Sequence, residues 1–506
     1  MKPSNTQIFE SLCNHVRETA LLSSSNALLG WDERTGLPSA AGPYRADQMT
    51  YLSGLIHQRQ TDPQLGEWLM TLANSELAGD PNSDTGATIR QLQRTFDRKT
   101  KLPQRLVEEL TRTSVLGQQA WSKARKENDF AAFQPILEQT IKLKREEAAT
   151  IGYQDCAYDA LLDDYEPHER TADVTRILND LRERLVPLVA EISESNRKPN
   201  VDLLRQSYPI AAQQSFGRAA AEMIGFQFDR GRLDETDHPF CSGMGPDDCR
   251  ILTRYDEHFF PSAFFSTLHE AGHGIYEQGL RREFFGLPPG EYVSLGIHES
   301  QSRLWENLVG RSESFWKWMF PQAQKAFPAA LKDVQLDDFY FAINDVRPSL
   351  IRVEADEATY NLHIILRFEL EQALIDDQLS VVDLPQAWQE QYQQYLGITP
   401  PNDADGILQD IHWSAGLIGY FATYSLGNLY AAQFFQQADA EIGGLAESFA
   451  QGDFHVLGEW LRDKIHQRGQ CHTPAELVEM ITGRKLQCDA LIQHLRDKAS
   501  PLYGLS

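Results

Sequence analysis

Apolar side chains recur at three- and four-residue spacing through most of the sequence. This period places them on one face of an α-helix and leaves charged side chains on the other face. The pattern is clear in residues 136–149, 174–186 and 362–377. Proline and glycine groups interrupt it without forming a long flexible linker. The pattern therefore predicts a mainly α protein, with residues 1–506 forming a single compact multi-helix unit.

Few segments have the character of a β-strand. Residues 250–255, Arg-Ile-Leu-Thr-Arg-Tyr, follow a loop rich in Gly and Asp and combine β-branched with aromatic side chains. Residues 291–294 are a weaker candidate. The two segments predict a small β-sheet, which we expect beside the functional site.

Composition and charge restrict the class of protein. Residues 414–438 carry no charge, but their polar side chains and three glycines favour a buried helix over a membrane span. A formal net charge of -25 argues against a nucleic-acid partner or an anionic membrane surface. The six cysteines contain no Cys-x-x-Cys pair, and the first residues lack the apolar core of a signal peptide. These features predict a soluble cytoplasmic protein.

The segment His269-Glu270-Ala271-Gly272-His273 carries the strongest chemical signal. Positions i and i+4 share one face of a helix, so both imidazoles can bind one metal ion. Zinc accepts histidine nitrogen and, in catalytic sites, keeps a position open for water. Glu270 adjoins this face and can take a proton from that water. We therefore expect one zinc ion per chain, bound by His269 and His273, with Glu270 as the general base.

Spacing within the motif does not identify the third ligand. The long form of the motif needs Gly and His three and six residues after its second histidine, where this chain has Tyr276 and Gly279. The other solution is a glutamate from a second helix, which we predict to begin near Leu295. That helix carries Glu299, which spacing alone leaves open as either a ligand or a solvated acid. Glu306 lies two turns further on and can orient a histidine ligand.

Other segments allow two interpretations. Arg352 and Asp356 lie four residues apart at the start of a predicted helix, where a surface ion pair is the simpler interpretation. The alternative is an arginine that binds a substrate carboxylate. His412 and Tyr420 either donate hydrogen bonds to an oxyanion or belong to a satisfied core network. His238 lies in a loop, where a lone histidine is usually exposed.

Taken together, these motifs resemble the carboxypeptidase Taq family of zinc metallocarboxypeptidases. The segments that carry the resemblance are Leu-Gly-Trp-Asp from 29, His-Glu-x-x-His from 269, His-Glu-Ser-Gln from 298, Ile-Arg-x-x-Ala-Asp from 351, Gly-x-x-Gln-Asp-x-His-Trp from 406 and Trp-Leu-Arg-Asp-Lys-Ile-His from 460. They extend over nearly the whole chain. Two positions depart from the family pattern: Leu252 replaces the threonine of an Asp-x-Arg-x-Thr motif, and Ala422 stands where proline is usual.

The resemblance implies a helical fold with a small sheet lining a deep groove, usually in a homodimer. It implies removal of single residues from peptide C-termini, with broad side-chain tolerance and poor cleavage next to proline. It also implies Glu299 as the third zinc ligand and Arg352, His412 and Tyr420 as substrate contacts. Arg250 and His238 are further candidates for contact with a peptide that ends in a free carboxylate. Cobalt is expected to substitute for zinc.

Two other classes of function remain open. A zinc oligoendopeptidase would have the same metal site but no need for Arg352 as a terminal anchor. An aminopeptidase would typically carry a Gly-x-Met-Glu-Asn anchor, which this chain lacks. A binding protein with a vestigial site would not need the base Glu270, which this chain retains.

Overall fold

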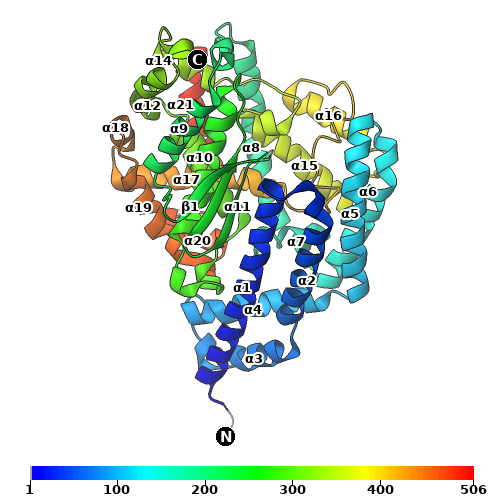
Figure 1. Ribbon diagram of the computed structural model, residues 1–506. Helices are drawn as coiled ribbons and strands as arrows, with labels where there is room; N and C mark the ends of the chain where they lie inside the picture. The colour runs from blue at the N-terminus through cyan, green and yellow to red at the C-terminus, as the bar shows by residue number, and fades with distance from the viewer. Residues whose placement is uncertain (1–2, 237, 506) are drawn as a thin grey trace. The chain divides into compact units, whose positions relative to one another are not determined.

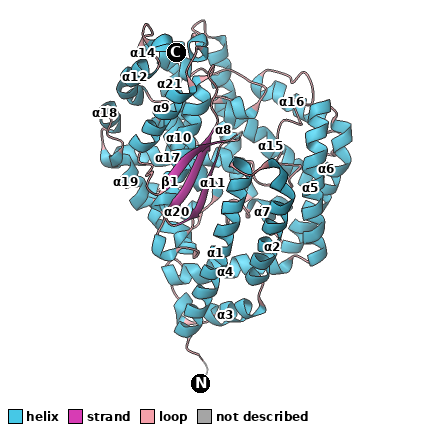
Figure 2. Cartoon of the chain, viewed as in Figure 1, coloured by secondary structure: helices cyan, strands magenta, loops and turns pink. Residues whose placement is uncertain are grey.

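The computed structural model describes residues 3–236 and 238–505 (Figure 1). It confirms a mainly helical protein, in which the described strands form a single small sheet (Figure 2). By its internal contacts the chain divides into two compact units. The first comprises Met1–Thr100, Asn200–Ile343 and Phe434–Gly483, and the second comprises Lys101–Pro199, Asn344–Gln433 and Arg484–Ser506. Each unit is therefore assembled from segments that are distant in sequence.

The first unit contains the sheet and most of the helices. Its helices are α1 (Asn5–Thr35), α2 (Gly42–Gln60), α3 (Pro63–Ala73), α4 (Asp84–Lys101), α9 (Ile210–Met223), α10 (Phe260–Gly279), α11 (Leu295–Arg303), α12 (Glu313–Ala326), α13 (Pro328–Leu331), α14 (Leu336–Ile343), α18 (Leu445–Ala450), α19 (His455–Lys464) and α20 (Pro474–Thr482). A π-helical segment, Leu304–Val309, continues α11. Such segments are rare and occur frequently at functional sites.

The sheet contains β1 (Gly231–Glu235), β2 (Phe240–Gly245) and β3 (Asp248–Thr253). Its order is β1-β3-β2, with β1 parallel and β2 antiparallel to the central β3. In the register, Cys241 is opposite Ile251 and Gly243 is opposite Cys249, so these four residues share one face. That face packs on α10, because a Cβ built on Gly274 of the helix would contact the side chain of Ile251.

Helix α10 is buried because it packs against the sheet on one side and aromatic side chains on another. Phe260 and Phe264, one turn apart, stack with ring centroids 5.1 Å apart. Phe216 of α9 and Trp316 of α12 pack on the Phe264 ring at 5.3 Å. A helix held on several sides has little freedom to move, so side chains that project from it are placed rigidly.

The second unit contains helices and loops but no strand among its described residues. Its helices are α5 (Gln104–Glu127), α6 (Phe130–Ile151), α7 (Ala157–Leu162), α8 (Thr171–Glu194), α15 (Thr359–Ile375), α16 (Leu384–Leu396) and α21 (Asp489–Tyr503). Helix α17 (Ala422–Ile442) begins in this unit and ends in the first. Ala422, which replaces a proline of the family pattern, is the first residue of α17, a position that suits proline because its N–H has no partner within the helix.

The predicted helices are confirmed, since residues 136–149 and 174–186 lie within α6 and α8, and α15 ends two residues before 377. The predicted strand 250–255 overlaps β3, but residues 291–294 do not form a strand and lie in a bend before α11. The predicted helix at Ile351 is also wrong, because only a short 3-10 turn, Arg352–Glu354, forms there. The uncharged stretch 414–438 is helical only from Ala422 onward.

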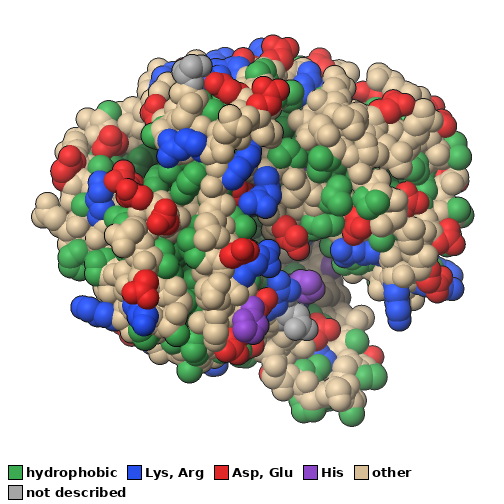
Figure 3. Space-filling view, turned by 90° about the horizontal axis from the view of Figure 1, so that it is seen from above, with side chains coloured by type: hydrophobic (Ala, Val, Ile, Leu, Met, Phe, Trp, Pro, Cys, Tyr) green, Lys and Arg blue, Asp and Glu red, His purple; other side chains and the backbone are tan. Residues whose placement is uncertain are grey.

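No helix among the described residues is long and apolar enough to cross a membrane. None of the six cysteines forms a disulfide within the described part of the chain. Figure 3 shows acidic and basic side chains interspersed across the face in view. On that face the excess of negative charge is therefore distributed and not gathered into one patch.

Candidate metal centre

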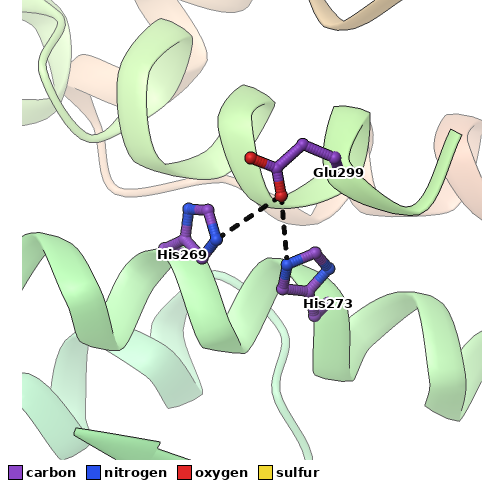
Figure 4. A group of neighbouring side chains, drawn as sticks. All are labelled: His269, His273 and Glu299. Atoms are coloured by element: carbon purple, nitrogen blue, oxygen red, sulfur yellow. Dashed lines mark ion pairs between the residues drawn. The ribbon is translucent and has the colours of Figure 1, made fainter. Parts of the chain in front are cut away.

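Helix α10 presents the two histidines of the His-Glu-x-x-His motif on one face (Figure 4). Their ring centroids lie 4.9 Å apart at an interplanar angle of 81°. The side chains of His269 and His273 are 18% and 15% exposed, so both rings sit in a nearly closed site. The spacing of four residues thus has the geometrical consequence that the sequence predicts.

Helix α11 brings Glu299 to the same point. The helix begins after Ser294, whose hydroxyl accepts a hydrogen bond from the Ile297 N–H at 3.1 Å, as an N-cap residue does. Glu299 Oε2 lies 3.6 Å from His269 Nε2 and 3.4 Å from His273 Nε2. The ligand atoms of the three residues all lie within 4.8 Å of one another. The prediction that the second helix begins near Leu295 is confirmed, and its glutamate does reach the histidines.

A glycine allows α10 and α11 to come this close. A Cβ on Gly272 would lie 2.6 Å from the carbonyl oxygen of Gln301 and 2.7 Å from the Cα of Ser302. Both distances are shorter than real Cβ contacts, and both neighbours are backbone atoms that cannot rotate away. The two helices therefore touch backbone to backbone beside the site.

The atoms that do not face this point are held by other side chains. His269 Nδ1 lies 2.9 Å from Glu306 Oε2. Arg303 donates from Nε to Glu299 Oε1 at 2.7 Å and from Nη1 to Glu306 Oε2 at 3.3 Å. One oxygen of Glu299 is thus held by Arg303, which leaves Oε2 directed at the imidazoles. Glu306 contacts a histidine of the motif, as its spacing suggested.

The electrostatics keep the two outer carboxylates ionised. Burial opposes ionisation of Glu299, but Arg303 and the nearby histidines outweigh it and hold the pKa of Glu299 well below its usual range. Burial likewise opposes ionisation of Glu306, yet its hydrogen bond to His269 and the charge of Arg303 lower the pKa of Glu306 to about 2. Burial lowers the pKa of His273 to about 3, which keeps that ring neutral.

Glu270 has the opposite shift. Burial raises the pKa of Glu270 to about 7, with a further contribution from the charge of Glu299, while His269 opposes the shift. A carboxyl group with a pKa near neutrality is poised to take up and release a proton at physiological pH. Glu270 follows His269 directly and lies three residues before His273, so this proton-exchanging group belongs to the same turn of α10.

The donor set fits a divalent metal ion. Two imidazole nitrogens and one carboxylate oxygen converge, and the remaining ring nitrogens have partners of their own. Three protein ligands of this kind are typical of a catalytic zinc site, where the fourth position is open to water. The three residues can therefore hold a metal ion.

Three of the predicted substrate contacts lie in the second unit, where they form one cluster. The Arg352 side chain is 7% exposed, and it donates to Asp410 Oδ1 from Nε at 2.9 Å and from Nη2 at 2.8 Å. His412 lies with its ring 4.4 Å from Phe421 and 5.4 Å from Tyr420. Burial lowers the pKa of His412 to about 4, so the ring is neutral.

The ion pair expected between Arg352 and Asp356 does not form. Asp356 accepts hydrogen bonds from the backbone N–H groups of Arg347, Ala358 and Thr359, the last of which is the first residue of α15. The segment is not helical at Arg352, so the spacing of four residues does not bring the two side chains together. Arg352 binds Asp410 instead, a residue 58 positions further along the chain.

The remaining two candidates lie in the first unit. Arg250 of β3 donates from Nε and Nη2 to the two oxygens of Asp248, both at 2.9 Å, and its guanidinium lies 4.4 Å from the centroid of the Trp31 ring. His238 is exposed in the loop before β2. Leu252, the departure from the family motif, is buried, while the neighbouring Thr253 donates its hydroxyl to the carbonyl of Ala263 in α10.

Sequence reasoning missed three residues around the metal centre. Arg303 follows Glu299 by four residues, a spacing that indicates an ion pair on a helix and gave a usable signal. Glu277 follows His273 by four residues in the same way. His298 was quoted only as part of a motif, yet its Nδ1 lies 2.5 Å from His273 Nδ1.

Comparisons with known proteins identify the family of the chain. Residues 11–499 match the carboxypeptidase Taq (M32) metallopeptidase family. Thermostable carboxypeptidase 1 of Thermus thermophilus is 46% identical over 505 residues, 98% of this chain and 99% of that protein. Carboxypeptidase 1 of Bacillus subtilis is 39% identical over 483 residues, 96% of each chain. The crystal structure of the M32 carboxypeptidase from Deinococcus radiodurans R1 is 40% identical, with a TM-score of 0.95 over 98% of this chain and 100% of that one. The chain therefore belongs to the carboxypeptidase Taq (M32) family and is a metallocarboxypeptidase, a hydrolase of peptide bonds.

Proposed function

We propose that this chain is a zinc-dependent carboxypeptidase that removes single amino acids from the C-termini of peptides. In this proposal His269, His273 and Glu299 hold one zinc ion, and Glu270 is the general base. The observation that carries it is the convergence of three ligand atoms within 4.8 Å, from two helices in backbone contact. Zinc accepts this combination of nitrogen and oxygen ligands readily, and cobalt can replace it.

Each residue of the metal centre has its own role in the proposed reaction. When bound, the zinc ion supplies Lewis acidity, which polarises the scissile carbonyl and acidifies water. The Glu270 carboxylate takes a proton from the attacking water and returns it to the nitrogen of the departing amino acid. Burial, which raises the pKa of Glu270 to about 7, makes both transfers accessible near neutral pH. Arg303 holds the outer oxygen of Glu299, so that the inner oxygen keeps its direction.

Recognition of the peptide's C-terminal carboxylate is assigned to a second group of residues. Arg352 binds the C-terminal carboxylate, because a guanidinium can donate two parallel hydrogen bonds to it. Asp410, whose pKa Arg352 and Arg367 hold well below its usual range against the effect of burial, keeps that guanidinium fixed. His412 and Tyr420 donate hydrogen bonds to the substrate, and Arg250 and His238 are further contacts. Specificity is broad for the released side chain and poor next to proline.

We further propose that the protein is a cytoplasmic homodimer and that residues 1–506 work as one peptidase unit. Support comes from the resemblance to the family, from the match over residues 11–499 and from the net charge of -25. One chain has a mass of 57.4 kDa, and light scattering of the purified protein should give about twice that mass. A monomer at micromolar concentration would contradict the dimer and leave the peptidase assignment unaffected.

A peptide ladder tests the proposed reaction directly. The purified protein should contain about one zinc ion per chain, as a single site with three protein ligands requires. Incubated with peptides of graded length, it should release single residues from the C-terminus, which mass spectrometry detects as a series of mass losses. Chelation should abolish the series, and zinc or cobalt should restore it. Losses from the N-terminus would favour an aminopeptidase, and internal cuts an oligoendopeptidase.

The anchor is tested with Arg352→Lys, which keeps the charge but loses the planar fork. We expect the metal to remain bound and kcat/KM on a peptide with a free C-terminus to fall by about 10- to 100-fold, as loss of hydrogen bonds to a charged group predicts. The same peptide with a C-terminal amide should already be a poor substrate and should lose little more.

A matched control is available on the same aspartate. Arg367 donates from Nε to Asp410 Oδ2 at 2.7 Å, but its side chain is 0% exposed and cannot reach a peptide. Arg367→Lys keeps a positive charge beside Asp410 and leaves the two hydrogen bonds of Arg352 to Asp410 Oδ1 in place, so it should lower kcat/KM on the free peptide far less than Arg352→Lys does. If Arg352→Lys lowered kcat/KM for the free and the amidated peptide by one common factor, Arg352 would not be the carboxylate anchor.

A further inference from the structure

A chain of three side chains extends from His273 away from the metal centre. His273 Nδ1 lies 2.5 Å from Nδ1 of His298 on α11, and His298 Nε2 lies 2.9 Å from Glu277 Oε1 on α10. The His298 and Glu277 side chains are 14% and 20% exposed. The four hydrogen-bonding atoms are therefore largely shielded from water, which would otherwise compete for them.

The two imidazoles meet edge to edge. Their ring centroids are 4.6 Å apart with an interplanar angle of 28°, and the two Nδ1 atoms are closer than atoms of face-stacked rings can be. Tyr276 and Tyr292 pack on the His298 ring at 5.3 Å and 4.8 Å. A ring fixed from two sides cannot turn to present another atom, so the Nδ1 contact is built into the fold.

Proton counting fixes the tautomers in this chain. A hydrogen bond between two ring nitrogens needs one proton, carried by one of them. His273 Nε2 faces Glu299 Oε2 at 3.4 Å and must be unprotonated to bind a metal, so its proton sits on Nδ1. His298 must then accept at Nδ1, and a neutral ring that accepts there carries its own proton on Nε2. That proton faces the carboxylate of Glu277, which can only accept.

The Glu277 carboxylate has the space that it needs to accept a hydrogen bond from His298 Nε2. A Cβ on Gly243 of β2 would lie 2.5 Å from Glu277 Oε2, so the sheet offers the carboxylate a position that a side chain would fill. His269, the other histidine of the motif, has Glu306 Oε2 directly at its Nδ1 at 2.9 Å. Each of the two histidines thus has its own carboxylate, reached directly in one case and through an imidazole in the other.

We propose that Glu277 and His298 are positioning residues that hold His273 as the Nδ1–H tautomer, with the lone pair of Nε2 directed at the metal. The inference rests on the proposed role of His273 as a ligand. Residues that orient metal-bound histidines typically contribute about 10- to 100-fold to metal affinity. Glu277 and His298 do not contact substrate. They act on the metal and on the tautomer of His273, and they affect catalysis only through these.

The experiment measures zinc affinity by competition with a chromophoric chelator, alongside the melting temperature of each metal-free protein. His298→Leu removes the acceptor and should weaken zinc binding by about 10- to 100-fold. His298→Asn places an amide oxygen near the position of Nδ1 and should restore most of the lost affinity. Glu277→Ala leaves the His298 ring packed and removes the last acceptor, so zinc affinity should fall by about 10-fold.

His466 supplies the matched control, because it is also buried and also packs on Tyr276, at 4.9 Å, but its Nε2 contacts Gln301 instead of a metal-site histidine. His466→Leu should lower the melting temperature and leave zinc affinity unchanged. In the metal-free protein labelled with 15N-histidine, NMR should show His273 protonated at Nδ1 in the wild type and a mixture of tautomers in Glu277→Ala.

Two outcomes distinguish an error in the positioning role from an error in the metal site itself. If His298→Leu and Glu277→Ala bound zinc as tightly as the wild type while His273→Ala lost it, the positioning role would be wrong. If His273→Ala and Glu299→Ala retained zinc, the proposed metal site itself would be wrong. Should His298→Leu fail to fold, an unchanged tautomer in Glu277→Ala would overturn the inference without it.

Discussion

Glu270→Gln should lower kcat by about two to four orders of magnitude while leaving the bound metal in place. Glutamine has the shape of glutamate but cannot accept a proton from water. The side chain is 6% exposed, so bulk water cannot easily reach the site to replace the missing base. The measurement is kcat on a peptide with a free C-terminus, together with zinc content per chain.

The control for Glu270→Gln lies in the same network. Glu306→Gln also removes a buried carboxylate near the two histidines, but one that contacts His269 Nδ1 and not the reacting water. It should weaken zinc binding and leave kcat of the fully loaded enzyme near the wild-type value. If Glu270→Gln kept near wild-type kcat with a full complement of zinc, another residue would be the base.

Glu299→Ala should lose the metal and with it the activity. The substitution removes one of three protein ligands, so zinc affinity should fall by more than the about 10- to 100-fold typical of a residue that only orients a ligand. Arg303 retains Glu306 as a partner at 3.3 Å, so the fold should survive without Glu299. Chelator competition measures the affinity, and the melting temperature of the metal-free protein reports on folding.

Glu306→Ala again provides the comparison for that experiment. It removes the carboxylate behind His269 and should cost less zinc affinity than Glu299→Ala. Equal losses for the two variants, or retention of zinc by Glu299→Ala, would contradict the assignment of Glu299 as the third ligand. The ranking of the two variants is therefore more informative than either value alone.

The sequence predicted those features that depend on local spacing. The motif from His269 to His273 lies on a helix, where spacing by four residues suffices to bring two rings together. The start of the second helix near Leu295 is likewise local, because Ser294 caps it. The prediction failed for the sheet partners, since β1 and β2 contain glycine and polar residues instead of the alternation typical of a strand.

Contacts between distant segments escaped prediction for a different reason. The sequence suggested that Arg352 pairs with Asp356, but the backbone there is not helical and the partner is Asp410. The link from His273 through His298 to Glu277 requires α10 and α11 to lie side by side, which no spacing within either helix reveals. Tertiary packing decides such contacts, and the pattern of residues along the chain does not reveal that packing.

The glycine at 272 has a consequence for how this protein can change over evolutionary time. Because α10 and α11 meet there through main-chain atoms, the gap between the motif histidines and Glu299 is independent of which side chains fill the surrounding core. Core residues can drift in size and shape while the gap persists. Any side chain at 272, even a methyl group, would meet the backbone of Gln301 and Ser302 and wedge the helices apart, so selection should keep glycine at this position while the apolar core around it diverges.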